Sequence, residues 1–360
     1  MFYRIRERSL IHMSNKLKKR LSQILLFALV MGFTFFTVFE GQDLNEILDS
    51  LKSLSPLALI AALISSFLYV SCEGFMIWFM FASHNGIKGF FQCISYAFIG
   101  FFYSGITPSA SGGQPMQLYY IKKDGYSFSK SCATLTVIAA MNKFVLASVG
   151  VVLLIFFNDV INEVFYGHMG WYYLGLIMVV FWVVLLLFIM ISPDLIERIG
   201  QAILRGLVKI HILKDSQKSA KAIHGFFDGY RDVKKSLLED KKKVTYMFLV
   251  SYLQRFFLVV LTYIVYRGFG LSGSSIQYIM LVQIAIMISV DMLPLPGAQG
   301  ITEFLYKRVF EGVFTSKYLT ASMCVTRFAN FYFLLLVGIL VVLGKAISNH
   351  YKNKNYMLDK

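Results

Sequence analysis

Apolar runs close to twenty residues long alternate with polar loops along most of the chain. Eight such runs can be drawn, and their lengths suit helices that cross a hydrocarbon layer about 30 Å thick. They cover residues 21–39, 57–81, 90–103, 133–157, 171–191, 244–266, 276–292 and 318–343. The pattern predicts an all-α integral membrane protein with about eight transmembrane helices.

Composition supports this class, since 57% of the 360 residues are hydrophobic and only 15% are charged. The net charge of +15 comes from basic residues in loops and tails, so we expect contact with anionic lipid and no nucleic-acid partner. Four cysteines lack metal-ligand spacing, and no metal or cofactor is predicted. They are Cys72, Cys93, Cys132 and Cys324.

The apolar run at 21–39 is predicted to be a membrane helix and not a signal peptide. It is longer than a typical signal core, and Glu40 to Asp43 follow it instead of a small-residue cleavage site.

Basic residues gather in three segments, which predicts the orientation. Residues 1–20 hold seven Lys or Arg, 192–243 hold twelve, and the tail adds four more. These segments are expected in the cytoplasm, with both termini, and the acidic stretches 40–56 and 158–170 outside. The predicted organisation is a basic N-terminus (1–20), a first membrane half (21–157), an outer loop and helix (158–191), a basic loop (192–243), the remainder of the second half (244–344) and a tail (345–360).

Two stretches broken by glycine and proline interrupt the apolar sequence 185 positions apart. They run from Thr107 to Pro115 and from Leu293 to Gly300. Backbone that leaves the helix at membrane depth must line a protein-buried or watery cavity, because hydrocarbon offers its amides no partner. Paired broken helices are typical of transporter binding sites.

For the apolar runs to match the predicted orientation, each broken stretch must bring the chain back to the side of the membrane from which it entered. The two halves then have opposite orientation, which predicts an inverted-topology repeat in which each half carries a re-entrant or broken segment. Matches at nearly the same offset support the repeat, such as Lys143 with Arg327.

Six ionisable residues fall within or beside the apolar runs, where charge is costly and usually serves a site. They are Glu73, Lys143, Arg255, Asp291, Glu303 and Arg327. The three cations are predicted to bind an anion, and a phosphate is the obvious lipid-borne one. Glu73 and Asp291 are candidates for a coupling proton. The alternative is that Glu73 pairs with a cation and the others extend to the interface.

Further contacts to the anion are predicted from the broken stretches and their neighbours, through hydroxyls, amides and exposed helix N-termini. These residues are Thr107, Ser109, Ser111, Gly112, Gly113, Gln114, Asn142, Pro294, Gly297, Gln299, Gly300, Thr302 and Glu303. The predicted cargo is an anionic phospholipid headgroup or a similar amphiphile.

At these positions the chain resembles the transmembrane region of the lysylphosphatidylglycerol synthase/flippase family, the multiple peptide resistance factor group. The resemblance rests on Gly105-Ile106-Thr107-Pro108, Gly112-Gly113-Gln114-Pro115, Asn142-Lys143 and Leu293-Pro294-Leu295-Pro296-Gly297 with Gly300 and Glu303. It spans about residues 20 to 345.

The resemblance implies a flippase of phosphatidylglycerol or its lysyl derivative in the bacterial plasma membrane. The family's soluble domain, which transfers lysine to phosphatidylglycerol, is expected to be absent, because only short polar segments lie outside the apolar runs. Two alternatives stay open: a membrane enzyme of lipid modification, and a membrane partner of a separate synthase. Candidate protein partners are a second copy, forming a homodimer, and an aminoacyl-lipid synthase.

The basic loop contains apolar residues at helical spacing, interspersed with arginine. They are Leu195, Ile196, Ile199, Ala202, Ile203, Leu207 and Ile210. This predicts either a helix on the anionic inner leaflet or one packed against the bundle.

Overall fold

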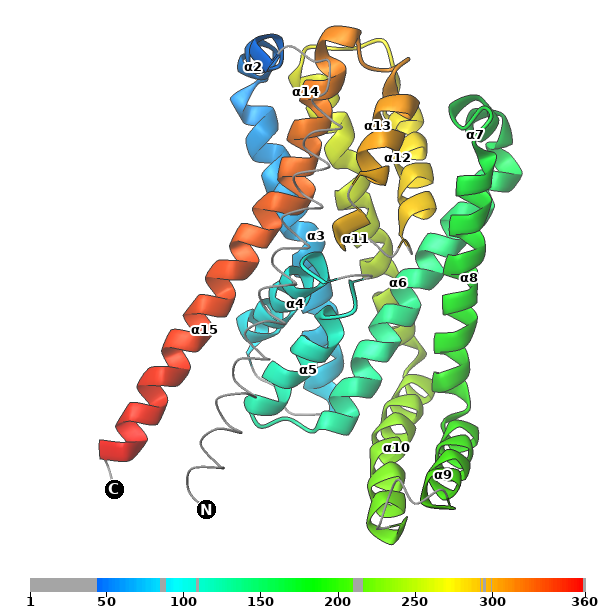
Figure 1. The fold of residues 1–360 in the computed structure, drawn as a ribbon, viewed down its shortest axis with the longest axis vertical. Coiled ribbons are helices and arrows are strands. Elements are labelled where there is room, and N and C mark those ends of the chain that lie inside the picture. The colour runs from blue at the N-terminus through cyan, green and yellow to red at the C-terminus, as the bar shows by residue number, and fades with distance from the viewer. Residues whose placement is uncertain are drawn as a thin grey trace, which may run out of the picture.

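The computed structural model describes residues 44–84, 89–107, 110–209, 216–291, 293, 296–298 and 300–358, and these are helical over most of their length (Figure 1). The first eight helices are α2 (Leu44–Lys52), α3 (Pro56–His84), α4 (Phe90–Gly105), α5 (Gly113–Lys123), α6 (Phe128–Phe156), α7 (Asn158–Val164), α8 (Met169–Ile191) and α9 (Pro193–Lys209). The remainder are α10 (Ser216–Glu239), α11 (Lys241–Gly268), α12 (Ile276–Val290), the short η2 (Pro296–Ala298), α13 (Ile301–Phe310), α14 (Ser316–Arg327), the π-helical η3 (Phe328–Tyr332) and α15 (Phe333–Leu358).

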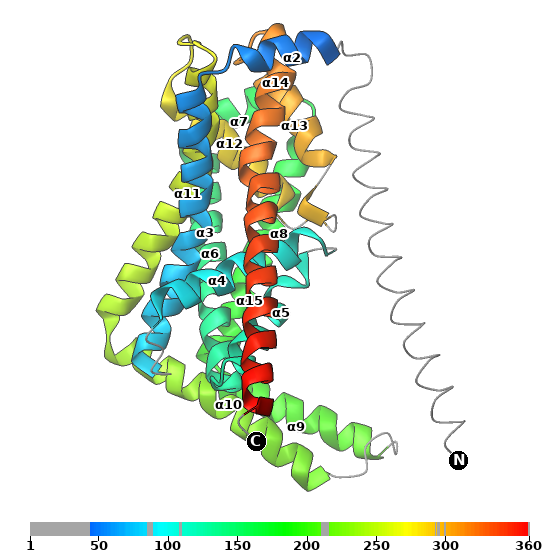
Figure 2. The same ribbon diagram turned by 90° about the vertical axis from the view of Figure 1, so that its left-hand side faces the viewer.

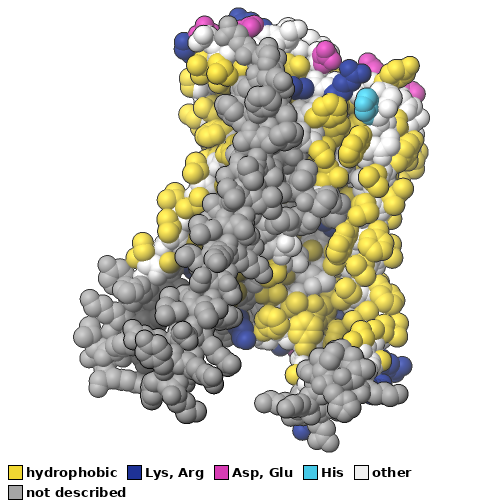
Figure 3. All heavy atoms as spheres, in the orientation of Figure 1, with side chains coloured by type: hydrophobic (Ala, Val, Ile, Leu, Met, Phe, Trp, Pro, Cys, Tyr) yellow, Lys and Arg dark blue, Asp and Glu magenta, His cyan; other side chains and the backbone are white. Residues whose placement is uncertain are grey.

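Five helical stretches of the described part are long and apolar enough to cross a membrane. They are Pro56–Ala82, Phe128–Phe156, Met169–Ile191, Lys241–Gly268 and Ser316–Ser348. In the coloured part of Figure 3, hydrophobic side chains predominate between the two ends, and most of the charged groups lie towards those ends. The predicted all-α membrane class is therefore confirmed, while the run at 21–39 lies outside the described residues.

Several helices begin before their apolar runs, because polar residues cap them. The Ser127 hydroxyl accepts a hydrogen bond from the Lys130 amide at 3.5 Å, so α6 begins five residues before the predicted start at 133. Asp240 accepts from the amides of Lys242 and Lys243 at 3.1 and 3.4 Å and starts α11 before 244. An apolar run marks the part of a helix that lies in the membrane, whereas the capping residues mark where the helix begins.

The last apolar run, predicted as one helix over 318–343, is interrupted. It contains α14, a π-helical turn and α15, and the turn follows directly after Arg327. A π turn inside a longer helix is a local irregularity that often accompanies a functional site.

Helices α3 and α11 pack side by side in opposite directions (Figures 1 and 2). The Ser65 hydroxyl donates to the Phe257 carbonyl at 2.5 Å, and farther along α3 the Ser251 hydroxyl lies 3.4 Å from the Met76 sulfur. The two helices are therefore antiparallel, as inverted halves require.

Each broken stretch forms a re-entrant hairpin. Helices α4 and α5 lie in the half of the molecule near α10, and α12 and α13 lie in the half near α2 (Figures 1 and 2). The two hairpins thus approach the middle from opposite ends, which confirms the predicted re-entrant segments.

The hairpins pack across the halves. Helix α4 contacts α15 of the second half, and α12 contacts α6 of the first. Two apolar cores result, one including Phe98 of α4 and Ile121 of α5, the other Ile286 of α12 and Phe310 of α13. The breaks lie where these two cores adjoin.

Candidate functional site

The first break is held together by Thr107. Its hydroxyl donates to the Tyr103 carbonyl at 2.6 Å and accepts from the Gly112 amide at 2.9 Å. This side chain replaces helical backbone pairing across the gap between α4 and α5. The hydroxyl predicted to contact a ligand is thus engaged with its own backbone.

Gly113 lets α5 return directly along α4. A Cβ at this position would lie 2.0 Å from the Ser104 hydroxyl oxygen and 2.8 Å from the Gly100 carbonyl oxygen. Any larger residue would push the hairpin apart. The glycine motif of the first break therefore sets the close approach of its two helices.

The second break is braced by a buried ion pair. Arg327 Nε donates to Glu303 Oε1 at 2.6 Å, and a terminal guanidinium nitrogen donates to the Gly297 carbonyl at 3.1 Å. The other Glu303 oxygen accepts from the Gly300 amide at 2.7 Å and so caps α13. The side chains are only 10% and 5% exposed. Phe331 packs its ring 5.0 Å from the Arg327 guanidinium.

Lys143 of α6 forms an ion pair with Asp291, the residue that follows α12. The partners come from different halves of the molecule. The pair therefore joins the first half to the second at the start of the second break.

Glu73 of α3 has a neutral partner. Its carboxylate accepts from the Gln117 side-chain amide of α5 at 2.7 Å. The sequence-based alternative was that Glu73 pairs with a cation, but in the structure its carboxylate is bound by the neutral Gln117.

A cavity of about 270 Å³ lies where the two breaks meet. The first break and its neighbourhood contribute Phe101, Ser104, Gly105 and Ala110, and the second contributes Asp291, Leu293, Gly297, Ala298 and Thr302. The long helices add Tyr69, Arg255, Leu258, Gln283, Ile286, Met287, Val290, Arg327, Asn330 and Phe331. The breaks thus line one cavity between the halves.

Arg255 differs from the other two predicted cations. It forms no salt bridge with a described residue, and its Nε is buried without a hydrogen-bond partner. Asn330, which also lines the cavity, has a buried side-chain oxygen that is likewise unpartnered. A buried polar group without a partner is costly, so these two atoms favour a polar ligand or water in the cavity.

The structure brings part of the predicted set together. Five predicted residues line the cavity, namely Arg255, Asp291, Gly297, Thr302 and Arg327. Lys143 and Glu303 reach it indirectly through their ion-pair partners. The Thr302 hydroxyl donates to the Ala298 carbonyl at 2.8 Å and so contributes to the backbone of the break.

Other predicted residues lie apart from the cavity lining. Ser111 and Gln114 are exposed, and Asn142 keeps a buried side-chain oxygen without a partner beside Lys143. Glu73, Thr107, Gly112, Gly113 and Gly300 shape or adjoin the breaks without lining the cavity. Ser109, Pro294 and Gln299 lie outside the described residues.

The sequence-based prediction took its neutral polar candidates from the two breaks and their neighbours and missed several others. Tyr69, Gln283 and Asn330 line the cavity, and Gln117 binds Glu73. Amides within apolar helices were the available signal, since such groups need partners in a membrane. Which of them face one cavity depends on helix rotation and on the π turn that contains Asn330.

Comparison with known families identifies the chain. Residues 21–338 match the family described as "Lysylphosphatidylglycerol synthase TM region". The chain belongs to this family. A search of curated proteins found no match.

Membership in this family confirms the predicted resemblance and places the protein in membrane lipid handling. The match includes both broken stretches and all the residues of the cavity. The cavity is therefore part of the shared membrane region.

Proposed function

We propose that this member of the family moves an anionic or aminoacylated phospholipid, of the phosphatidylglycerol or lysylphosphatidylglycerol type, between the leaflets of the bacterial plasma membrane. The observation that carries the proposal is the cavity between two re-entrant hairpins, with Arg255 as its cation without a carboxylate partner among the described residues. The phosphate would occupy the cavity while the acyl chains remain in lipid.

The charge arrangement supports an anionic group beside Arg255. Arg327 and Lys143 are each balanced by a carboxylate, so neither needs a ligand as counter-ion. Arg255 offers donors in a planar fork suited to phosphate. A phosphate oxygen would satisfy its buried Nε.

The inverted hairpins support alternating access. One hairpin extends from each end of the molecule, so rocking one half against the other would open the cavity to one leaflet at a time. The Lys143–Asp291 pair joins the halves next to the cavity and is the contact that such rocking must change. By the distribution of basic residues, the α9–α10 end and both termini would face the cytoplasm.

Glu73 and Asp291 remain the candidates for a coupling proton. Each has one described hydrogen-bonding partner, Gln117 and Lys143 respectively, whose contact depends on the charge of the carboxylate. A transport rate that does not change with pH would eliminate this part of the proposal.

The test is a leaflet-accessibility assay in proteoliposomes with fluorescent phosphatidylglycerol and its lysyl derivative. Arg255→Ala is expected to lower the initial rate at subsaturating lipid about ten- to hundredfold, because a charge-assisted hydrogen bond contributes about 1.5–3 kcal/mol. Arg267→Ala is the matched control, since Arg267 is an exposed arginine in the last turn of the same helix. Lys143→Ala and Arg327→Ala are expected to be slower than wild type as well.

Equal rates for wild type and Arg255→Ala, with both proteins folded, would overturn the assigned site. Addition of radiolabelled lysyl-tRNA to the same vesicles tests the enzymatic alternative directly. New labelled lipid made by the purified chain would favour an enzyme of lipid modification over a flippase.

A further inference from the structure

Helix α9 has one broad apolar face, and only part of that face is used for packing within the protein. Leu204 is buried and Ile196 is half-buried on the side towards α10. On the part of this face that continues away from α10, Leu195, Ile199 and Ile203 are 45%, 45% and 59% exposed. Packing within the protein therefore explains only half of the amphipathic pattern.

Helix α10, and not α9, attaches this helical pair to the bundle. The Ser129 hydroxyl of α6 donates to the Phe226 carbonyl of α10, and the Gly229 amide donates back to that hydroxyl at 3.1 Å. Lys234 of α10 donates to the carbonyl of Ile191, the last residue of α8, at 2.5 Å. Helix α9 is held against α10 and leaves its outer side open.

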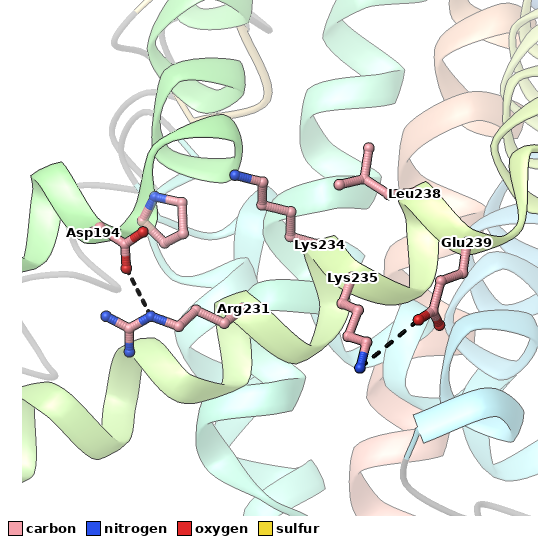
Figure 4. A pocket seen from close by; sticks show the side chains of 7 residues that line it. Asp194, Arg231, Lys234, Lys235, Leu238 and Glu239 are labelled. Atoms are coloured by element: carbon pink, nitrogen blue, oxygen red, sulfur yellow. Dashed lines mark hydrogen bonds and ion pairs between the residues drawn. The ribbon is translucent and has the colours of Figure 1, made fainter.

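The acids and the arginines of α9 differ in their partners. Asp194 and Glu197 both bind Arg231 of α10, the former at 2.8 Å (Figure 4). Arg198 and Arg205 are exposed and form no salt bridge with a described residue. At about 100° per residue these arginines lie along one edge of the exposed apolar stripe. The exposed part of α9 is thus apolar and basic, while Glu197 is buried and the 67% exposed Asp194 is engaged by Arg231.

The position of α9 matches the edge of the membrane. It begins two residues after α8, a membrane-spanning helix, and together with α10 runs obliquely across the long axis of the bundle (Figure 2). An apolar stripe flanked by arginine at this level complements the acyl chains and phosphates of an anionic leaflet.

We propose that α9 lies in the interface of the anionic leaflet, with Leu195, Ile199 and Ile203 among the upper acyl chains and Arg198 and Arg205 on lipid phosphates. The helix thereby fixes the depth of this end of the bundle in the bilayer. The assignment does not depend on which lipid the cavity carries.

The test uses the full-length chain in vesicles of neutral lipid with or without phosphatidylglycerol. A fluorophore is placed on Ile203→Cys in a protein whose native cysteines are serine. The matched position is Lys235→Cys, because Lys235 is a 77% exposed side chain of α10. In anionic vesicles a lipid carrying a shallow nitroxide is expected to quench the label at 203 several-fold more than the label at 235. Aqueous iodide should give the opposite order.

A label-free measurement guards against misfolding of the cysteine-free protein. Trypsin should cut the wild-type chain after Arg198 and Arg205 several-fold more slowly in anionic vesicles than in neutral ones, with cleavage after Lys235 unchanged. Arg198→Glu with Arg205→Glu should abolish the effect of anionic lipid on quenching at 203. Equal iodide access at 203 and 235 would overturn the proposal. Protection at 203 that disappears when the protein is diluted in lipid would overturn it as well, because a second copy of the chain, and not lipid, would then cover α9.

Discussion

At the residue scale, three intramembrane cations that look alike in sequence have different environments. Arg327 and Lys143 each form an ion pair with a carboxylate. Arg255 lines the cavity and has no carboxylate partner among the described residues. A desolvated charge is tolerated only with partners, so the paired cations brace the structure and Arg255 favours a ligand.

We expect the stability of the protein to fall more when one partner of the Glu303–Arg327 pair is removed than when both are removed. Glu303→Gln leaves an unbalanced buried cation and Arg327→Met an unbalanced anion, and removing one partner of a buried pair costs about 3–5 kcal/mol. The double variant should be more stable than the sum of the single effects predicts, which thermal unfolding in detergent would measure. Strictly additive losses would argue against a buried pair.

At the element scale, the proposed function depends on the two interruptions. One hydroxyl and one ion pair satisfy backbone groups of Gly112, Gly297 and Gly300 where α4 passes to α5 and α12 passes to α13. Gly297 has a φ of 60°, a left-handed conformation that other residues enter with strain.

Gly297→Ala is expected to destabilise the protein and lower transport together. An added Cβ would lie 2.5 Å from the Phe331 ring in addition to the strained φ. Gly344→Ala in α15 is the control, because nothing lies within 4 Å of its added Cβ and alanine favours a helix by about 0.5–1 kcal/mol. A lower unfolding temperature is expected for the first variant and an unchanged or higher one for the second. The reverse order would refute this reading of the second break.

At the scale of the whole molecule, the halves are joined near the end of α5 as well as at the cavity. Asp124 accepts hydrogen bonds from Lys345 of α15 at 2.6 Å, from Tyr96 at 2.6 Å and from Gln92 at 2.9 Å. Burial by itself raises the pKa of Asp124, but the bonds from Lys345, Tyr96 and Gln92 lower it more, so its pKa lies below the ordinary 3.8.

This cluster predicts a loss of stability in acid. A carboxyl with a lowered pKa in the folded state stabilises the fold fully above its ordinary pKa of 3.8, and the contribution is lost as pH falls through the lower folded value. Asp124→Asn should lower the unfolding temperature near neutral pH and flatten its decline below pH 3.8. Asp49→Asn, at a 70% exposed carboxylate, should change little. An Asp124→Asn protein with the acid profile of wild type would exclude this cluster as the cause.

The sequence by itself determined the membrane class, the family and the two re-entrant breaks, because long apolar runs and helix-breaking glycines and prolines are local properties of the chain. It also named Lys143, Arg255, Asp291, Glu303 and Arg327 as costly charges. Only the tertiary structure decided that Lys143 binds Asp291, that Arg327 binds Glu303, and that Arg255, Gln283 and Asn330 share a cavity. Pairing depends on how helices rotate and cross, and residues on different helices, here 24 positions apart for Glu303 and Arg327 and 148 for Lys143 and Asp291, carry no local signal of that geometry.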